Sequence, residues 1–198
     1  MKTLFNSRKF YDLANSYISS LDNKINKLTK IDFERSSIDD FTRKYTTEYT
    51  FNIPELDEEE IFQKKPEDTK IRIERRGSYG SGTVLDGTKY TLVIPFKGDS
   101  SLFEIFPTSY LSILPFGEII SNEIHIVFEI PVGKDVSRIK ADFDSNLITI
   151  KKYLDFLSED ANQFNNKLEP AIKITLEKRK AKLDKDDDIA NSFGFPIR

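Results

Sequence analysis

The sequence predicts an α+β protein, in which an antiparallel sheet of five or six strands lies between an N-terminal helix and a long C-terminal helix. Apolar residues recur at three- and four-residue steps near the N-terminus, alternate with polar residues in several short central segments, and return to helical spacing after residue 133. The regular alternation of strands and helices that marks a parallel sheet is absent, so we expect antiparallel pairing.

The first helix is predicted from about Ser7 to Lys30. Its apolar positions form one stripe: Phe10, Leu13, Tyr17, Leu21, Ile25 and Leu28. Ser7 is a suitable N-cap because its hydroxyl can accept a hydrogen bond from a free amide of the first turn. The polar stretch 31–44 that follows is too charged for a central core element.

Period-two alternation predicts the strands. The first is Tyr45–Ile53, where aromatic or β-branched residues stand at odd positions and polar residues at even ones, until Pro54 ends it. Further strand signals are Ile71–Ile73, Tyr90–Phe96, Leu102–Phe106 and Ile124–Ile130. Glycine-containing turns separate them. Each strand has one more apolar face, which indicates a sheet covered on one side.

The long helix is predicted over Val136–Leu168, because apolar residues keep heptad spacing there without an interrupting Gly or Pro. At about 1.5 Å per residue it would reach roughly 50 Å. Pro170 is expected to break it, and a second helix is predicted over Ile172–Leu183 with this proline near its first turn. We therefore divide the chain into residues 1–133, a helix plus β core, and residues 134–198, which hold the helices and the C-terminal tail.

Six apolar residues of the long helix form a seam, called here the helix seam: Ile150, Leu154, Leu157, Ala161, Phe164 and Leu168. One interpretation is a helical hairpin within the chain. The other is a coiled coil between chains. The sequence favours neither, because the chain has two other amphipathic helices that could cover the seam.

Composition excludes several classes of function. The chain has 198 residues, no cysteine and one histidine, so it lacks a thiolate metal site, a cysteine nucleophile and a multi-histidine metal centre. We expect no enzyme activity, no metal and no cofactor. Its net charge of −3 gives no long-range attraction to nucleic acid. The N-terminus lacks the apolar run of a signal peptide, and no stretch approaches the roughly 20 apolar residues of a membrane span, so we expect a cytoplasmic protein without membrane contact.

A glycine-rich segment, Gly77–Thr83, offers a candidate anion contact. The residues concerned are Arg75, Arg76, Gly80 and Gly82. The segment lacks the lysine and the following helix of a phosphate-binding loop, so we favour a hairpin loop. His125, the single imidazole, is interpreted as a solvent-side strand residue beside Glu123 and Glu129.

A metal-dependent nuclease or nucleic-acid-binding module is the alternative function. Two clusters of acidic residues, each accompanied by lysine, suggest the nuclease. They are Asp57–Glu60 with Lys64 and Lys65, and Asp142 and Asp144 with Lys151. Asp142 and Asp144 do not face each other on a helix, because they are two residues apart. The basic cluster Lys178–Lys182 could contact nucleic acid, although acidic residues flank it on both sides.

Short motifs from residue 98 onward resemble a known arrangement. They are Gly98–Phe103, Pro107–Ser109, Pro115–Gly117, Phe164-Asn165, Arg179–Leu183 and Phe193–Arg198. This part of the chain resembles the region that precedes the effector domain in bacterial multidomain anti-phage defence proteins, where the effector is of the Toll/interleukin-receptor or restriction-endonuclease type. The resemblance implies an N-terminal accessory module that ends where an effector would begin, and it assigns no functional residues.

The sequence thus predicts a non-enzymatic interaction, oligomerisation or sensor module of a bacterial cytoplasmic system, and the resemblance implies a role in antiviral defence. Assembly would proceed through the helix seam. The expected partners are proteins, either a second copy in a homo-oligomer or a downstream effector domain.

Overall fold

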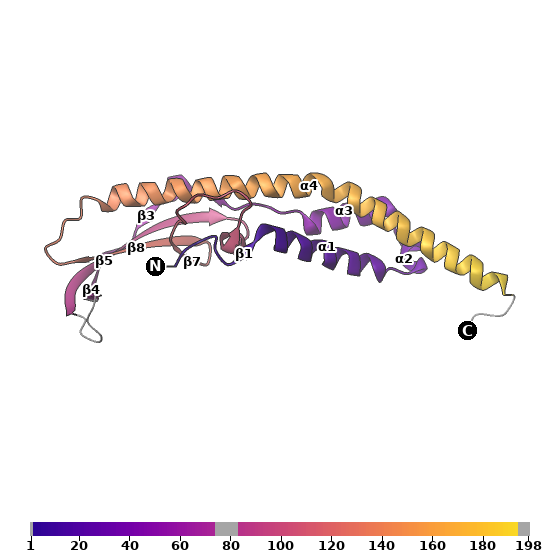
Figure 1. Cartoon of the computed structure of the whole chain (residues 1–198), viewed down its shortest axis with the longest axis horizontal. Coiled ribbons are helices and arrows are strands. Elements are labelled where there is room, and N and C mark those ends of the chain that lie inside the picture. Colours follow the sequence, from indigo (N-terminus) through magenta and orange to yellow (C-terminus); the bar gives the residue numbers. More distant parts are fainter. Residues whose placement is uncertain (1, 74–82, 194–198) are drawn as a thin grey trace. The chain divides into compact units, whose positions relative to one another are not determined.

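The computed structural model describes residues 2–73 and 83–193 (Figure 1). The contacts divide the chain into two compact units. The sheet unit comprises Met1–Lys9 and Asn52–Leu157, and the helical unit comprises Phe10–Phe51 and Ser158–Arg198. Helix α4, Ile139–Ser192, contributes residues to both units. The division at residue 133 stays a prediction.

Among the described residues, six strands form an antiparallel sheet in the sheet unit, which confirms the predicted α+β fold class. They are β2 (Glu55–Leu56), β3 (Phe62–Gln63), β4 (Glu67–Ile73), β5 (Thr83–Lys97), β7 (Glu118–Ile120) and β8 (Glu123–Pro131). The order is β2-β5-β8-β7, and β3 and β4 also pair with β5. A separate parallel pair joins β1 (Arg8–Lys9) to β6 (Ile105–Phe106), and two 3₁₀ turns cover Glu58–Glu60 and Ser100–Glu104.

The core of the sheet unit includes the predicted apolar face, but Thr91 and Val93 on the opposite face of β5 are buried as well, so the sheet is not covered on one side only. Ile94 of β5 lies opposite Ile124 of β8, and both are fully buried. Aromatic rings extend this core. The ring of Phe5 stacks on that of Tyr153 in α4 with centroids 5.2 Å apart, and it also contacts Phe103. The sheet is therefore packed through large apolar side chains from strands, loops and helix.

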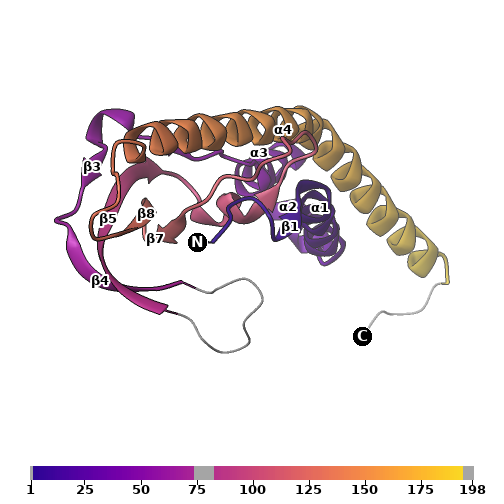
Figure 2. The ribbon, with the colours of Figure 1, turned by 60° about the vertical axis from the view of Figure 1, so that its left-hand side comes forward.

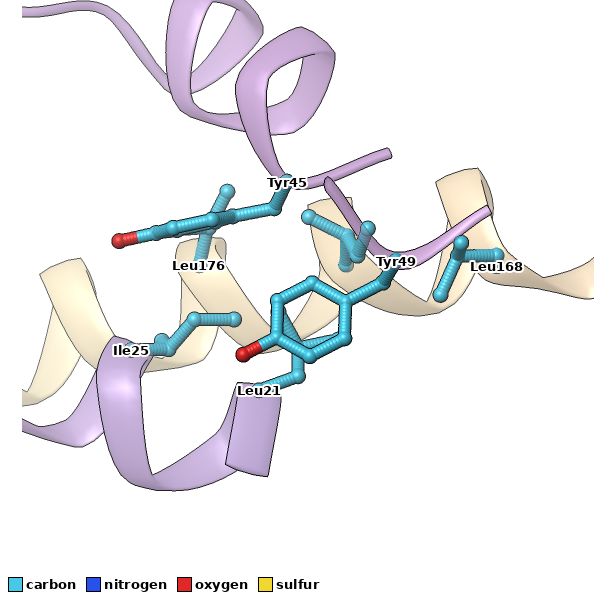
Figure 3. Packing of buried hydrophobic residues seen from close by; sticks show 7 residues of the cluster. Leu21, Ile25, Tyr45, Tyr49, Leu168 and Leu176 are labelled. Carbon is cyan, nitrogen blue, oxygen red and sulfur yellow. The ribbon is translucent and has the colours of Figure 1, made fainter. Parts of the chain in front are cut away.

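The helical unit contains α1 (Phe10–Asn26), α2 (Lys30–Arg35), α3 (Ile38–Tyr49) and the C-terminal part of α4. Its core is a cluster of seven buried side chains: Leu21, Ile25, Tyr45, Tyr49, Leu168, Ile172 and Leu176. Figure 3 shows how residues of α1, α3 and α4 converge in this cluster. Burial of this apolar surface holds α1 and α3 against the C-terminal part of α4.

The strand predicted at Tyr45–Ile53 is wrong, because Tyr45 and Tyr49 belong to α3. Residues four apart share a helix face as well as a strand face, and here the helix face enters the core cluster. A capping box of Ser37 and Asp40 starts this helix within the polar stretch 31–44. The run Leu102–Phe106 is also mostly 3₁₀ turn, and only Ile105–Phe106 forms a strand.

The break predicted at Pro170 does not occur, since α4 continues through it for a total of 54 residues. A proline inside a helix costs about 3 kcal/mol. Leu168 and Ile172 flank it and are both buried in the core cluster, so packing on each side holds the helix together. The first helix also begins later than expected, because Ser7 donates its backbone N–H to Glu104 and Arg8–Lys9 pair with β6.

We predict that Leu176→Ala lowers the free energy of unfolding by about 2–5 kcal/mol, because it empties part of the core cluster. Ile174→Ala is the matched control on the same helix, since Ile174 is 51% exposed, and it should cost far less. Urea unfolding measures both. Equal losses for the two variants would contradict the packing described here.

We also predict a pH effect at the start of α3. Two hydrogen bonds from Ser37 lower the pKa of Asp40 below its ordinary value of 3.8. The larger effect comes from the side-chain hydroxyl and the smaller from the backbone N–H. A lowered pKa means that the ionised form stabilises the fold at neutral pH, and that this stabilisation is lost as the pH falls through the folded-state value. Ser37→Ala should raise the pKa of Asp40 toward 3.8 in an NMR titration.

Asp135 provides the internal control for that titration. Ser137 lowers its pKa in the same way, and Ser37→Ala should leave it unchanged. If the pKa of Asp40 does not respond to the substitution, the capping hydroxyl is not what lowers that pKa.

Candidate functional site

Two buried side chains of α4 bind the backbone of the loop 107–117, called here the anchored loop. The side-chain amide of Asn146 donates to the carbonyl of Phe116 at 2.8 Å and accepts from its N–H at 3.0 Å. The hydroxyl of Tyr153 donates to the carbonyl of Leu111 at 3.0 Å and accepts from its N–H at 3.2 Å. Both side chains are buried, so the loop is fixed at two points within the sheet unit.

The helical unit uses the same arrangement. Asn165 of α4 exchanges two hydrogen bonds of 3.0 Å with the backbone of Phe51. Arg179 donates from Nε and Nη2 to the carbonyl of Leu28, at 3.0 and 2.8 Å. The α4 helix therefore supplies backbone partners to segments that lack regular secondary structure, in each unit separately.

These backbone-binding residues were missed by the sequence analysis. Asn146 and Tyr153 follow the apolar residues Phe143 and Ile150 by three positions, so they occupy the buried side of the helical pattern. A polar residue at such a position needs a hydrogen-bond partner. That was the available signal, although it does not reveal which distant backbone segment provides the partner.

The anchored loop exposes two large apolar side chains. Tyr110 is 62% exposed and Ile113 is 73% exposed. The ring of Tyr110 contacts that of Phe106, with centroids 5.0 Å apart, so its orientation is restricted. Exposed aromatic and aliphatic side chains on a fixed loop are typical of surfaces that bind other proteins.

His125 is buried, contrary to the interpretation as a solvent-side residue, and only 6% of it is exposed. Its Nε2 lies 2.6 Å from a carboxylate oxygen of Glu123. Two clefts border His125. One, of about 370 Å³, includes Val127 and Glu129, and the other, of about 420 Å³, includes Asn122. The sequence of β8 alternates as predicted, but other segments border the face that carries His125, among them Lys2, Lys64 and Ile71.

The helix seam is buried within the single chain. Ile150, Leu154 and Leu157 are buried in the sheet unit, whereas Ala161 and Leu168 are buried and Phe164 half-buried in the helical unit. The seam is therefore covered within one chain, but a hairpin in which residues 136–168 fold back on Ile172–Leu183 does not form, because both segments belong to the continuous helix α4. The candidate anion contact, Arg75, Arg76, Gly80 and Gly82, lies outside the described residues.

In the described part of the chain, three carboxylates of the nuclease alternative make ion pairs with lysines: Asp57, Glu58 and Asp144. Lys151 lies 2.7 Å from Glu58, which brings one member of each predicted group together. Asp144 instead pairs with Lys140 at 2.5 Å. Across residues 2–73 and 83–193, no group of three or more His, Cys, Asp or Glu residues is placed to hold a metal ion.

Comparison with known proteins gives no relative: no family model, no curated protein and no solved structure matches the chain. Among the described helices, none is long and apolar enough to cross a membrane.

We predict that Tyr153→Phe releases the anchored loop at one point only. The substitution removes the hydroxyl and leaves the ring in the core, so the Leu111 amide should exchange with solvent about fivefold faster, as expected for the loss of roughly 1 kcal/mol. The Phe116 amide should be unaffected. Asn146→Ala should have the opposite selectivity, and Asn162→Ala, at an exposed position of α4, should change neither amide. Hydrogen exchange followed by NMR resolves the two sites, and loss of protection at both from either substitution would contradict independent anchoring.

Proposed function

We propose that this chain is a non-enzymatic protein-binding module, and that its sheet unit presents the anchored loop to a partner protein. The observation that supports the proposal is the exposure of Tyr110 and Ile113 on a loop whose backbone is held at Leu111 and Phe116. Binding through a flexible loop costs ordering entropy. A loop that α4 already holds avoids much of this cost.

The nature of the two exposed residues supports the same function. Tyrosine is enriched among the residues that dominate binding energy, because it offers a large apolar ring and a hydroxyl with few rotatable bonds. Ile113 adds apolar area at the same loop. Since the helix seam is buried within the chain, we place the contact on the loop rather than on the seam.

The biological setting is part of the proposal. Residues 98–198, which resemble the accessory region of bacterial defence proteins, include the whole anchored loop. A cytoplasmic effector domain is therefore the partner that we propose, with a second copy of the chain as the other protein candidate. The nuclease alternative has less support, because Asp144 and Lys151 are engaged in separate ion pairs.

We predict that a photo-crosslinking amino acid at position 110 captures a discrete partner when the chain is produced from its native gene. The matched control is the same amino acid at position 11, because Tyr11 is 70% exposed in the helical unit. Ile113→Ser should weaken capture from position 110, since it removes neighbouring apolar contact area. Mass spectrometry of the adducts identifies the partner.

Folding of each variant is checked by its melting temperature, which should stay near that of the unmodified chain because both positions are exposed. Equal capture from positions 110 and 11, or capture that Ile113→Ser leaves unchanged, would contradict a specific contact at the anchored loop.

A further inference from the structure

Strand β4 is an edge strand. It pairs with β5 residue by residue, from Glu67 opposite Lys89 to Ile73 opposite Thr83. Over the part of the chain that the structure describes, β5 is its only strand neighbour. Figure 2 shows β4 running beside β5 at the margin of the sheet. The far side of β4 therefore carries backbone N–H and C=O groups that can pair with another strand.

The charges along β4 are self-complementary. Asp68, Lys70 and Arg72 alternate along one face of the strand. Lys70 forms an ion pair with Asp86 of β5, which balances its charge within the sheet. Asp68 and Arg72 are exposed, and neither has an ion-pair partner among the described residues.

Backbone geometry restricts how two copies of β4 could pair antiparallel. The N–H and C=O groups of successive residues point to opposite edges, so only residues that point outward in both copies can bond. A symmetric pair must therefore have its two-fold axis at a residue rather than between two residues. Axes at residues 69, 70 and 71 are the ones that use most of the strand.

The length of the paired segment and the charges together distinguish these three registers. With the axis at Lys70, all seven residues of β4 pair, and Asp68 of each copy lies opposite Arg72 of the other. Lys70 then lies opposite Lys70, but each of the two already has an ion-pair partner, Asp86, within its own sheet. An axis at Ile71 sets Lys70 opposite Arg72, which places like charges together. An axis at Thr69 sets Asp68 opposite Lys70, but it pairs only residues 67–71 of β4 with each other and sets Pro66, which has no N–H, opposite Arg72.

We propose that β4 binds β4 of a second copy, antiparallel about a two-fold axis at Lys70, so that two sheets join edge to edge. The interface is independent of the anchored loop, and it gives self-association a surface other than the buried helix seam. Charged residues protect a sheet edge from non-specific pairing. Here the register at Lys70 is favoured because it pairs all seven residues of β4 and sets Asp68 opposite Arg72 at both sites.

Charge reversal tests the register. The unmodified chain should be dimeric by analytical ultracentrifugation at tens of micromolar. Asp68→Arg and Arg72→Asp should each weaken the dimer about tenfold or more, because both cross-strand pairs become repulsive. The double variant, Asp68→Arg with Arg72→Asp, should restore it.

An equimolar mixture of the two single variants is the sharpest experiment. Each variant repels itself, but a mixed pair places opposite charges together at both sites, so a heterodimer should form from two chains that are separately monomeric. Asp155→Arg, at an exposed position of α4, is the control for a change of net charge and should leave the dimer intact. Recovery on mixing also shows that the single variants are folded.

A cysteine substitution tests the axis directly. The chain contains no cysteine, so Lys70→Cys would place two thiols at the axis within disulfide distance, and oxidation should link the copies. Lys64→Cys is the exposed control outside β4 and should not crosslink. A monomeric unmodified chain, no heterodimer on mixing, or equal crosslinking from positions 64 and 70 would each overturn the proposal. A monomer whose Arg72→Asp variant loses binding to a different protein would assign the edge to that protein instead.

Discussion

The structure depends on one kind of interaction, the pairing of a buried or half-buried polar side chain of α4 with the backbone N–H and C=O of a loop residue. A backbone N–H or C=O that is buried without a partner costs about 1–3 kcal/mol, so loops that pack against a helix need partners for these groups. The amide of Asn146 offers a donor and an acceptor side by side, and it satisfies both groups of Phe116 as a neighbouring strand would. Asn165 does the same for Phe51.

The unusual length of α4 follows from the same distribution of contacts. Its N-terminal part supplies Ile150, Tyr153 and Leu157 to the core of the sheet unit, and its C-terminal part supplies Leu168, Ile172 and Leu176 to the core cluster of the helical unit. Because buried contacts continue on both sides of Pro170, the helix is held together where its local sequence favours an end. One element thus stabilises two cores.

The two proposed contact surfaces differ in their physical basis. The anchored loop offers apolar side chains whose orientation is already fixed, so affinity would come from burial of Tyr110 and Ile113. The edge of β4 offers backbone hydrogen bonds, and the alternating charges of Asp68, Lys70 and Arg72 restrict the register. Neither surface uses the helix seam, which is buried in the chain's own cores.

The sequence by itself determined the fold class, the strands around Ile71, Ile94 and Ile126, and the long helix, because in those segments the spacing of apolar residues is compatible with one secondary structure only. It could not decide Tyr45–Ile53, since a four-residue spacing of tyrosines fits both a helix and a strand, and the core cluster selected the helix. The partners of Asn146, Tyr153 and Asn165, and the burial of His125, were decided by the tertiary structure. The hydrogen-bond partners lie 30 to 114 residues away in the chain, and His125 is bordered by distant segments, so no local pattern encodes which segment will arrive there.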